Sequence, residues 1–245
     1  MKLRLAKFAI GLALVPLCLA LAMTLGRAAL ILVQSPTRLP LLHAFAGVAG
    51  IALWAVVWLF LPPLTRTYVL GHELTHALWA MLFGGKASGL KITDRGGSVR
   101  VSKNNVWVTL APYFFPLYTV LVILLHLLIR CFVNPVPLPL FWLFFVGLTW
   151  GFHVTFTVQS LMITQPDIQA YGRLFSSVII YLFNLAGVGL WVVCTTSATF
   201  GPFSAALGTH TLAVYASVQD EIQARTTHFS HTVMPYLINL LHHHG

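Results

Sequence analysis

The segment that decides the fold is residues 67–83, TYVLGHELTHALWAMLF, which two prolines precede and two glycines follow. Proline and glycine end helices, so this apolar run between them is predicted to be one helix, with Thr67 capping its start. Inside it stand three ionisable residues, His72, Glu73 and His76. Residues four apart share a helix face, so the two histidines are predicted to point in the same direction.

This HExxH pattern is typical of zinc sites. Two imidazoles on one helix face can hold a zinc ion at about 2.0–2.1 Å each. Glu73, next to the first histidine, can act as the general base toward a water molecule that the ion activates. Ionisable side chains within apolar spans are energetically costly, and by default they indicate function. The alternative is that His72, Glu73 and His76 only form hydrogen bonds with neighbouring helices.

The composition indicates a membrane protein. The chain is 58% hydrophobic and 8% charged, whereas an ordinary soluble domain is about 45–50% apolar and about 25% charged. Its formal net charge of +9 comes from Lys and Arg residues between apolar segments, where they favour anionic lipid headgroups and the cytoplasmic side. We therefore expect an integral, multi-pass membrane protein with the lipid bilayer, and not nucleic acid, as its partner.

The hydropathy pattern predicts an all-α polytopic membrane protein with about six transmembrane helices and a short β-hairpin after the HExxH helix. The first apolar run follows a basic start, as in a signal peptide, but we expect it to remain as an uncleaved span. We divide the chain into amino-terminal spans at 1–66, a membrane core at 67–196 and a tail at 197–245. The predicted spans are residues 8–25, 41–61, 67–84, 107–129, 139–161 and 173–196.

Residues 86–105 are the most polar stretch of the first two hundred, and their alternating pattern predicts the β-hairpin, with a turn at residues 94–97. A free strand edge of this hairpin could bind an extended peptide, or the hairpin could be a solvated connector whose basic residues face lipid headgroups. The amino terminus is also basic. If residues 67–84 cross the membrane, these two basic regions lie on opposite sides, and the orientation stays open.

A catalytic zinc ion usually has three protein ligands. Asp167, in the sequence Gln165-Pro166-Asp167-Ile168, lies at a proline break, where a carboxylate can project from irregular backbone into a cavity. We favour Asp167 as the third ligand. The alternatives are that Asp167 only caps the next helix, or that the third ligand is His153 or Glu221.

These residues carry a family resemblance. The sequence Gly71-His72-Glu73-Leu74-Thr75-His76-Ala77 in an early apolar helix, then a β-hairpin and a later Pro-Asp pair, resembles the site-2 protease family of intramembrane zinc metalloproteases. The resemblance covers roughly residues 67–190. It implies zinc ligands at His72, His76 and Asp167, catalysis by Glu73, and a membrane-anchored protein as substrate.

The sequence therefore predicts a membrane-embedded zinc metallopeptidase that hydrolyses peptide bonds of membrane-anchored proteins. Two other hypotheses remain open. One is a non-catalytic zinc-binding membrane protein, a pseudoprotease. The other is a metal-ion transporter, although a permeation path should need ionisable residues in several spans, and this chain has only 5 Asp and Glu residues.

Overall fold

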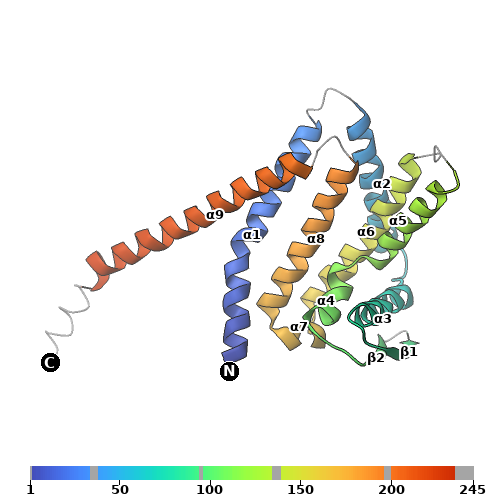
Figure 1. Cartoon of the computed structure of the whole chain (residues 1–245), viewed down its shortest axis with the longest axis horizontal. Coiled ribbons are helices and arrows are strands. Elements are labelled where there is room, and N and C mark those ends of the chain that lie inside the picture. Colours follow the sequence, from blue (N-terminus) through green and yellow to red (C-terminus); the bar gives the residue numbers. More distant parts are fainter. Residues whose placement is uncertain (1, 34–37, 94–95, 134–138, 196–199, 235–245) are drawn as a thin grey trace.

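The computed structural model describes residues 2–33, 38–93, 96–133, 139–195 and 200–234. These residues are mostly helical and include one two-stranded antiparallel sheet, as predicted (Figure 1). A five-residue π-helix, Phe229–Val233, follows the last α-helix. The elements are α1 Lys2–Val33, α2 Arg38–Phe60, α3 Thr65–Leu82, β1 Ala87–Thr93, β2 Gly96–Val101, α4 Val106–Phe114, α5 Leu117–Arg130, α6 Pro139–Met162, α7 Pro166–Tyr171, α8 Arg173–Thr195 and α9 Phe200–His228.

Within the described residues, four helices are long and apolar enough to cross a membrane: α1, α2, α6 and α8. The helices α4 and α5 meet at a 75° bend and could together form one broken span. The predicted count of six spans is not confirmed. If that bent pair is counted as one span, the remaining difference lies in α3, whose 18 residues include Arg66, Glu73 and several threonines, so that it is too polar over its length to qualify.

The spans pack as closely placed pairs, α2 against α6 and α1 against α8. A Cβ atom on Gly147 of α6 would collide with the backbone of Gly47 in α2. Small residues let helix backbones approach, and van der Waals packing is the main attraction between helices in lipid. This contact therefore holds α2 and α6 together, and Trp54 of α2 packs beside it against Phe152 and Phe156 of α6.

Because α3 does not cross the bundle, the amino terminus of α1, α3, the hairpin and α7 lie together at one end, the lower end in Figure 1. We call this the basic end. The two basic regions, which would lie on opposite sides if residues 67–84 crossed the membrane, therefore lie at the same end of the molecule. The Lys and Arg residues at the start of α1, in α3, in and beside the hairpin and at the start of α8 are Arg4, Lys7, Arg66, Lys86, Lys91, Arg100, Lys103 and Arg173.

The carboxyl-terminal end of α3 agrees with the prediction, and its amino-terminal end does not. The helix ends at the two glycines, and Gly84 adopts a φ of 72° that favours glycine. Its start differs from the prediction. The helix begins at Thr65 with no side-chain cap, so Thr67 is not the capping residue. The two prolines before it already interrupt the chain, and they place the first helical residue earlier.

The hairpin is confirmed, but its turn is shorter than predicted. Gly96 pairs with Thr93 and Gly97 pairs with Ile92, so both glycines belong to β2 and not to the turn. The predicted turn residues 94 and 95 lie outside the described residues. A one-residue irregularity falls between Ser88 and Lys91, which bends β1.

The predicted tail contains a long helix. Helix α9 contacts α1 and then projects away from the bundle (Figure 1). Thr24 Oγ1 lies 2.9 Å from His210 Nδ1, and the Tyr215 hydroxyl donates a hydrogen bond of 2.6 Å to the Ala13 carbonyl. The terminal histidines, 242–244, lie outside the described residues.

Candidate metal centre

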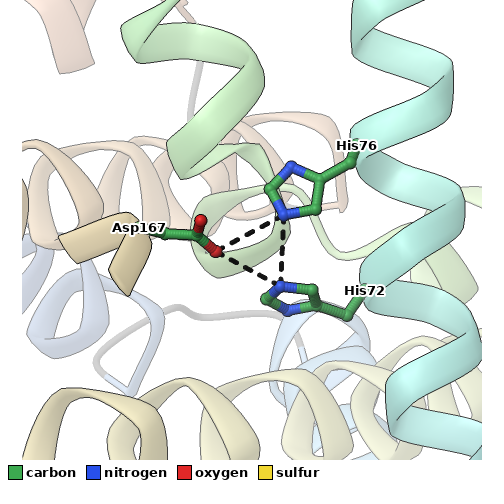
Figure 2. Close-up of side chains that lie close together, drawn as sticks. All are labelled: His72, His76 and Asp167. Carbon is green, nitrogen blue, oxygen red and sulfur yellow. Dashed lines mark hydrogen bonds and ion pairs between the residues drawn. The ribbon is translucent and has the colours of Figure 1, made fainter. Parts of the chain in front are cut away.

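The structure brings His72 and His76 of α3 together with Asp167 of α7, as Figure 2 shows. The two Nε2 atoms are 3.2 Å apart. Asp167 Oδ2 lies 3.5 Å from His72 Nε2 and 3.4 Å from His76 Nε2. One ligand atom from each of three residues therefore converges on one point, although 91 positions of sequence separate His76 from Asp167. We call these three residues the metal group.

Hydrogen bonds behind the rings fix the orientation of both imidazoles. His76 Nδ1 donates to the Val108 carbonyl at 2.8 Å. His72 Nδ1 lies 3.3 Å from the Tyr68 hydroxyl, which lies 2.9 Å from Ser160 Oγ. Such partners on the far ring nitrogen are typical of metal-binding histidines, because they set the tautomer and aim the other nitrogen. Both Nε2 atoms are thus left to face Asp167.

Asp167 is held by its position in α7 and by a tyrosine. The helix begins with Pro166, and its N-cap residue is Gln165, so Asp167 is not the N-cap. The hydroxyl of Tyr113, which is fully buried, donates to Asp167 Oδ2 at 3.1 Å. Burial alone would raise the pKa of the Asp167 carboxyl, but hydrogen bonds and charge interactions with the two histidines hold that pKa below its ordinary value. The side chain is therefore a carboxylate.

The donor set fits a zinc ion. Two ligands about 2.0–2.1 Å from a tetrahedral ion are about 3.3–3.4 Å apart, and the three separations in the metal group are 3.2, 3.4 and 3.5 Å. Two imidazoles and one carboxylate are ligands that zinc accepts, and three protein ligands leave a fourth position open, as in catalytic zinc sites. The role of these residues as zinc ligands stays a prediction that this geometry favours.

Glu73 lies beside the metal group and is 8% exposed. The backbone N–H of Val99 in β2 stabilises the charged form of the Glu73 carboxyl group. Burial raises the pKa of the Glu73 carboxyl, and the two histidines and Val99 oppose this shift. A carboxylate whose pKa lies above the ordinary value is a better proton acceptor near neutral pH, which suits the predicted role as general base.

Gly97 brings the hairpin to Glu73. A Cβ atom on Gly97 would stand 2.8 Å from Glu73 Cγ and 2.5 Å from Val69 Cγ1. Only glycine therefore lets β2 lie this close to α3 without displacing the catalytic candidate. The sequence predicts Gly97 in the turn and gives no sign of this contact, because a glycine in a turn and a glycine at the start of the following strand cannot be told apart by pattern.

A cavity of about 630 Å³ opens in front of the metal group. Its walls come from α3, from β2 and from the segment that leads into α7. Glu73, His72, His76 and Asp167 all reach it. A polypeptide segment could therefore approach Glu73 and the metal group along β2.

The alternative ligands lie elsewhere. His153 of α6 shares a small cavity with His72, but it is not part of the metal group in the described residues. Glu221 pairs with Arg225 on α9 at 2.6 Å. The aromatic residues Tyr68 and Tyr113 were not recognised as partners of the site. Tyr68 could have been, because it stands four residues before His72 on the same helix face. No local pattern connects Tyr113 with Asp167.

Comparison of the chain with protein-family models, with curated proteins and with solved structures finds no match.

Proposed function

We propose that this protein is a zinc-dependent intramembrane metallopeptidase that hydrolyses peptide bonds of membrane-anchored proteins, as its resemblance to the site-2 protease family implies. The observation that carries the proposal is the convergence of His72, His76 and Asp167. Their ligand atoms lie within 4.8 Å of one another, on two separate helices, directly beside the buried Glu73. Buried ionisable groups of this kind are energetically costly in a membrane protein, and by default they indicate a functional site.

Each side chain has one role in the proposed reaction. His72, His76 and Asp167 hold the ion, which when bound supplies Lewis-acid chemistry and lowers the pKa of water. Glu73 accepts the proton of the attacking water and then delivers it to the nitrogen of the leaving amine. Val99 positions the Glu73 carboxylate through its backbone N–H.

The shape of the site supports a polypeptide substrate. The cavity is lined by Gly96, Gly97, Ser98, Val99 and Val101 of β2. In the described residues, β2 pairs only with β1, so the other edge of this cavity-lining strand has no strand partner. An extended peptide can add to such an edge through backbone hydrogen bonds. This arrangement would hold a substrate in the extended form that peptide hydrolysis requires.

The position of the site supports a membrane-anchored substrate. The metal group lies at the basic end, where the span α6 ends and the span α8 begins. The cavity also includes the apolar Ile163, which follows α6 directly. A substrate whose chain leaves the bilayer near the end of α6 would therefore have its backbone next to the cavity.

The decisive experiment compares wild type with Glu73→Gln, and uses Glu221→Gln as the matched control. Glu221 lies on α9 and contacts Arg225, so the control makes the same chemical change far from the site. We expect Glu73→Gln to keep bound zinc and to lose activity by about 10²–10⁴-fold, since that is the usual contribution of a general base. Uncleaved membrane proteins should accumulate in cells that carry Glu73→Gln, and the control should behave as wild type.

Two results would contradict the proposal. Identical protein fragments in wild type, Glu73→Gln and chelator-treated membranes would leave a zinc-binding protein without peptidase activity. Zinc flux into proteoliposomes that depends on Glu73, with no peptide bond cut by either form, would indicate a transporter.

A further inference from the structure

A second cavity, of about 620 Å³, lies at the basic end between the first turns of α1, helix α7 and the start of α8. Three cationic side chains line it: Arg4 and Lys7 from α1, and Arg173 from α8. We call this cavity the basic pocket. It is separate from the cavity in front of the metal group, which no residue of α1 or α8 lines.

The cations of the basic pocket have no acidic partner there. No Asp or Glu lines it among the residues that the structure describes. Lys7 Nζ instead lies 4.2 Å from the centre of the Tyr171 ring, and Arg173 Nη2 donates to the Leu161 carbonyl at 3.0 Å. An aromatic ring and a carbonyl orient the two cations but do not neutralise them. Three like charges around one cavity repel one another, so an anion there would relieve this repulsion.

The same cavity has an apolar wall, formed by Phe8 of α1 and by Leu174 and Phe175 of α8. The pocket therefore lies where two candidate spans begin, and it has a cationic part, which we call the rim, and an apolar wall. On α1 the neighbouring Leu5, Phe8 and Leu12 are 68%, 54% and 57% exposed, which leaves an apolar surface that leads away from the cations. A soluble anion would use only the rim, whereas an amphipathic anion would use both parts.

The charge distribution favours a position of the pocket against an anionic surface. Most of the described Lys and Arg residues belong to elements of the basic end, and segments rich in these residues favour the cytoplasmic side. The cytoplasmic leaflet carries anionic lipids, and basic pockets between membrane helices on that side bind their headgroups.

We propose that the basic pocket binds the phosphate headgroup of an anionic phospholipid of the cytoplasmic leaflet, whose acyl chains lie along the exposed apolar face of α1. Arg4, Lys7 and Arg173 contact the phosphate oxygens, and Phe8 contacts the first methylene groups of the chains. Arg is well suited to this role, because its planar guanidinium can bind two phosphate oxygens together. The proposal does not depend on the peptidase activity.

The test titrates the full-length protein in detergent with dioctanoyl phosphatidylglycerol, with phosphatidylcholine of the same chain length and with inorganic phosphate, by calorimetry. The variant Arg4→Gln/Lys7→Gln/Arg173→Gln removes the three cations of the pocket. The matched control, Lys86→Gln/Lys91→Gln/Arg100→Gln, removes three charges from the hairpin at the same end of the molecule. None of these hairpin residues lines either cavity.

We expect saturable binding of phosphatidylglycerol, but not of phosphatidylcholine, to wild type. Each cation near a membrane surface contributes roughly a factor of five to binding an anionic lipid, so the triple pocket variant should bind on the order of 100-fold more weakly. The hairpin control should differ from wild type by less than about twofold. If the triple variant does not fold, Arg4→Gln alone, an exposed change with a roughly fivefold expected effect, supplies the comparison.

Two outcomes would overturn the proposal. Equal weakening in the pocket variant and the hairpin control would show attraction by overall charge, not a site. Inorganic phosphate that binds as tightly as phosphatidylglycerol would show that the occupant is a free anion and that the apolar wall has no part in binding.

Discussion

The metal group and the basic pocket share the short helix α7, but they balance charge in opposite ways. In the metal group, Asp167 faces two histidines, and each ring has a further partner behind it. In the basic pocket, Arg4, Lys7 and Arg173 surround a cavity that no described carboxylate lines. The metal group contains donors that converge on one point, which suits a small ion. The basic pocket is lined by three cations around a cavity of about 620 Å³, which suits the larger anion proposed for it. The kind of ligand thus follows from the spacing of the charges.

The largest expected effect is a loss of zinc binding that leaves lipid binding at the basic pocket unchanged. His72→Ala/His76→Ala should abolish bound zinc, because a single remaining carboxylate cannot hold the ion. Phosphatidylglycerol binding should stay within about twofold of wild type, since neither histidine lines the basic pocket. Elemental analysis of the purified protein gives the zinc content. His228→Ala/His231→Ala, two exposed histidines beyond the bundle, is the control. Full zinc in the site variant would refute the metal group.

The next effect concerns Asp167, which belongs to α7 and therefore to the helix that both sites share. Asp167→Asn should weaken zinc binding by more than the 10–100-fold that loss of an outer partner costs, because it removes a charged ligand. A competition titration with a chelator measures the affinity. The control is Asp220→Asn on α9. Unchanged zinc affinity in Asp167→Asn would transfer the role of third ligand to another residue.

A smaller effect is expected at Gly97, which touches the site without contacting the metal group. In Gly97→Val the new side chain collides with Val69 and Glu73, so β2 must move away from α3. Catalytic activity should fall by up to about 10²-fold, the cost of a misplacement near 1 Å, while zinc content stays at the wild-type level. Ser88→Val, a similar enlargement on β1, serves as the control. Simultaneous loss of zinc would mean that β2 supports the metal group itself.

The smallest effect is expected at Tyr113. In Tyr113→Phe the hydrogen bond to Asp167 is lost while the ring stays in place. Loss of such an outer partner should lower zinc affinity by about 10-fold, near the lower limit for these changes. The matched control is Tyr181→Phe on α8, whose side chain is 47% exposed. An equal affinity in wild type and Tyr113→Phe would mean that α7 alone positions the carboxylate.

The sequence by itself determined the features that depend on short stretches of chain. Apolar runs predicted four helices that qualify as spans, and alternating residues predicted the hairpin, because both periodicities are local. The spacing of His72 and His76 placed them on one face of α3 for the same reason. The count of six spans is not confirmed, and α3 is one place where it differs, since a helix with several polar residues can resemble a span in the sequence and still lie at the end of the bundle.

The tertiary structure alone decided how distant segments meet. Asp167 was one of three candidates for the third ligand, and only the packing of α7 against α8 and α4 brings its carboxylate to the imidazoles. The approach of Gly97 to Glu73 and the hydrogen bond from Tyr113 arise in the same way. So does the gathering of Arg4, Lys7 and Arg173 around one cavity. These contacts join residues far apart in the chain, and no local propensity specifies them, because they follow from the close packing of side chains between helices.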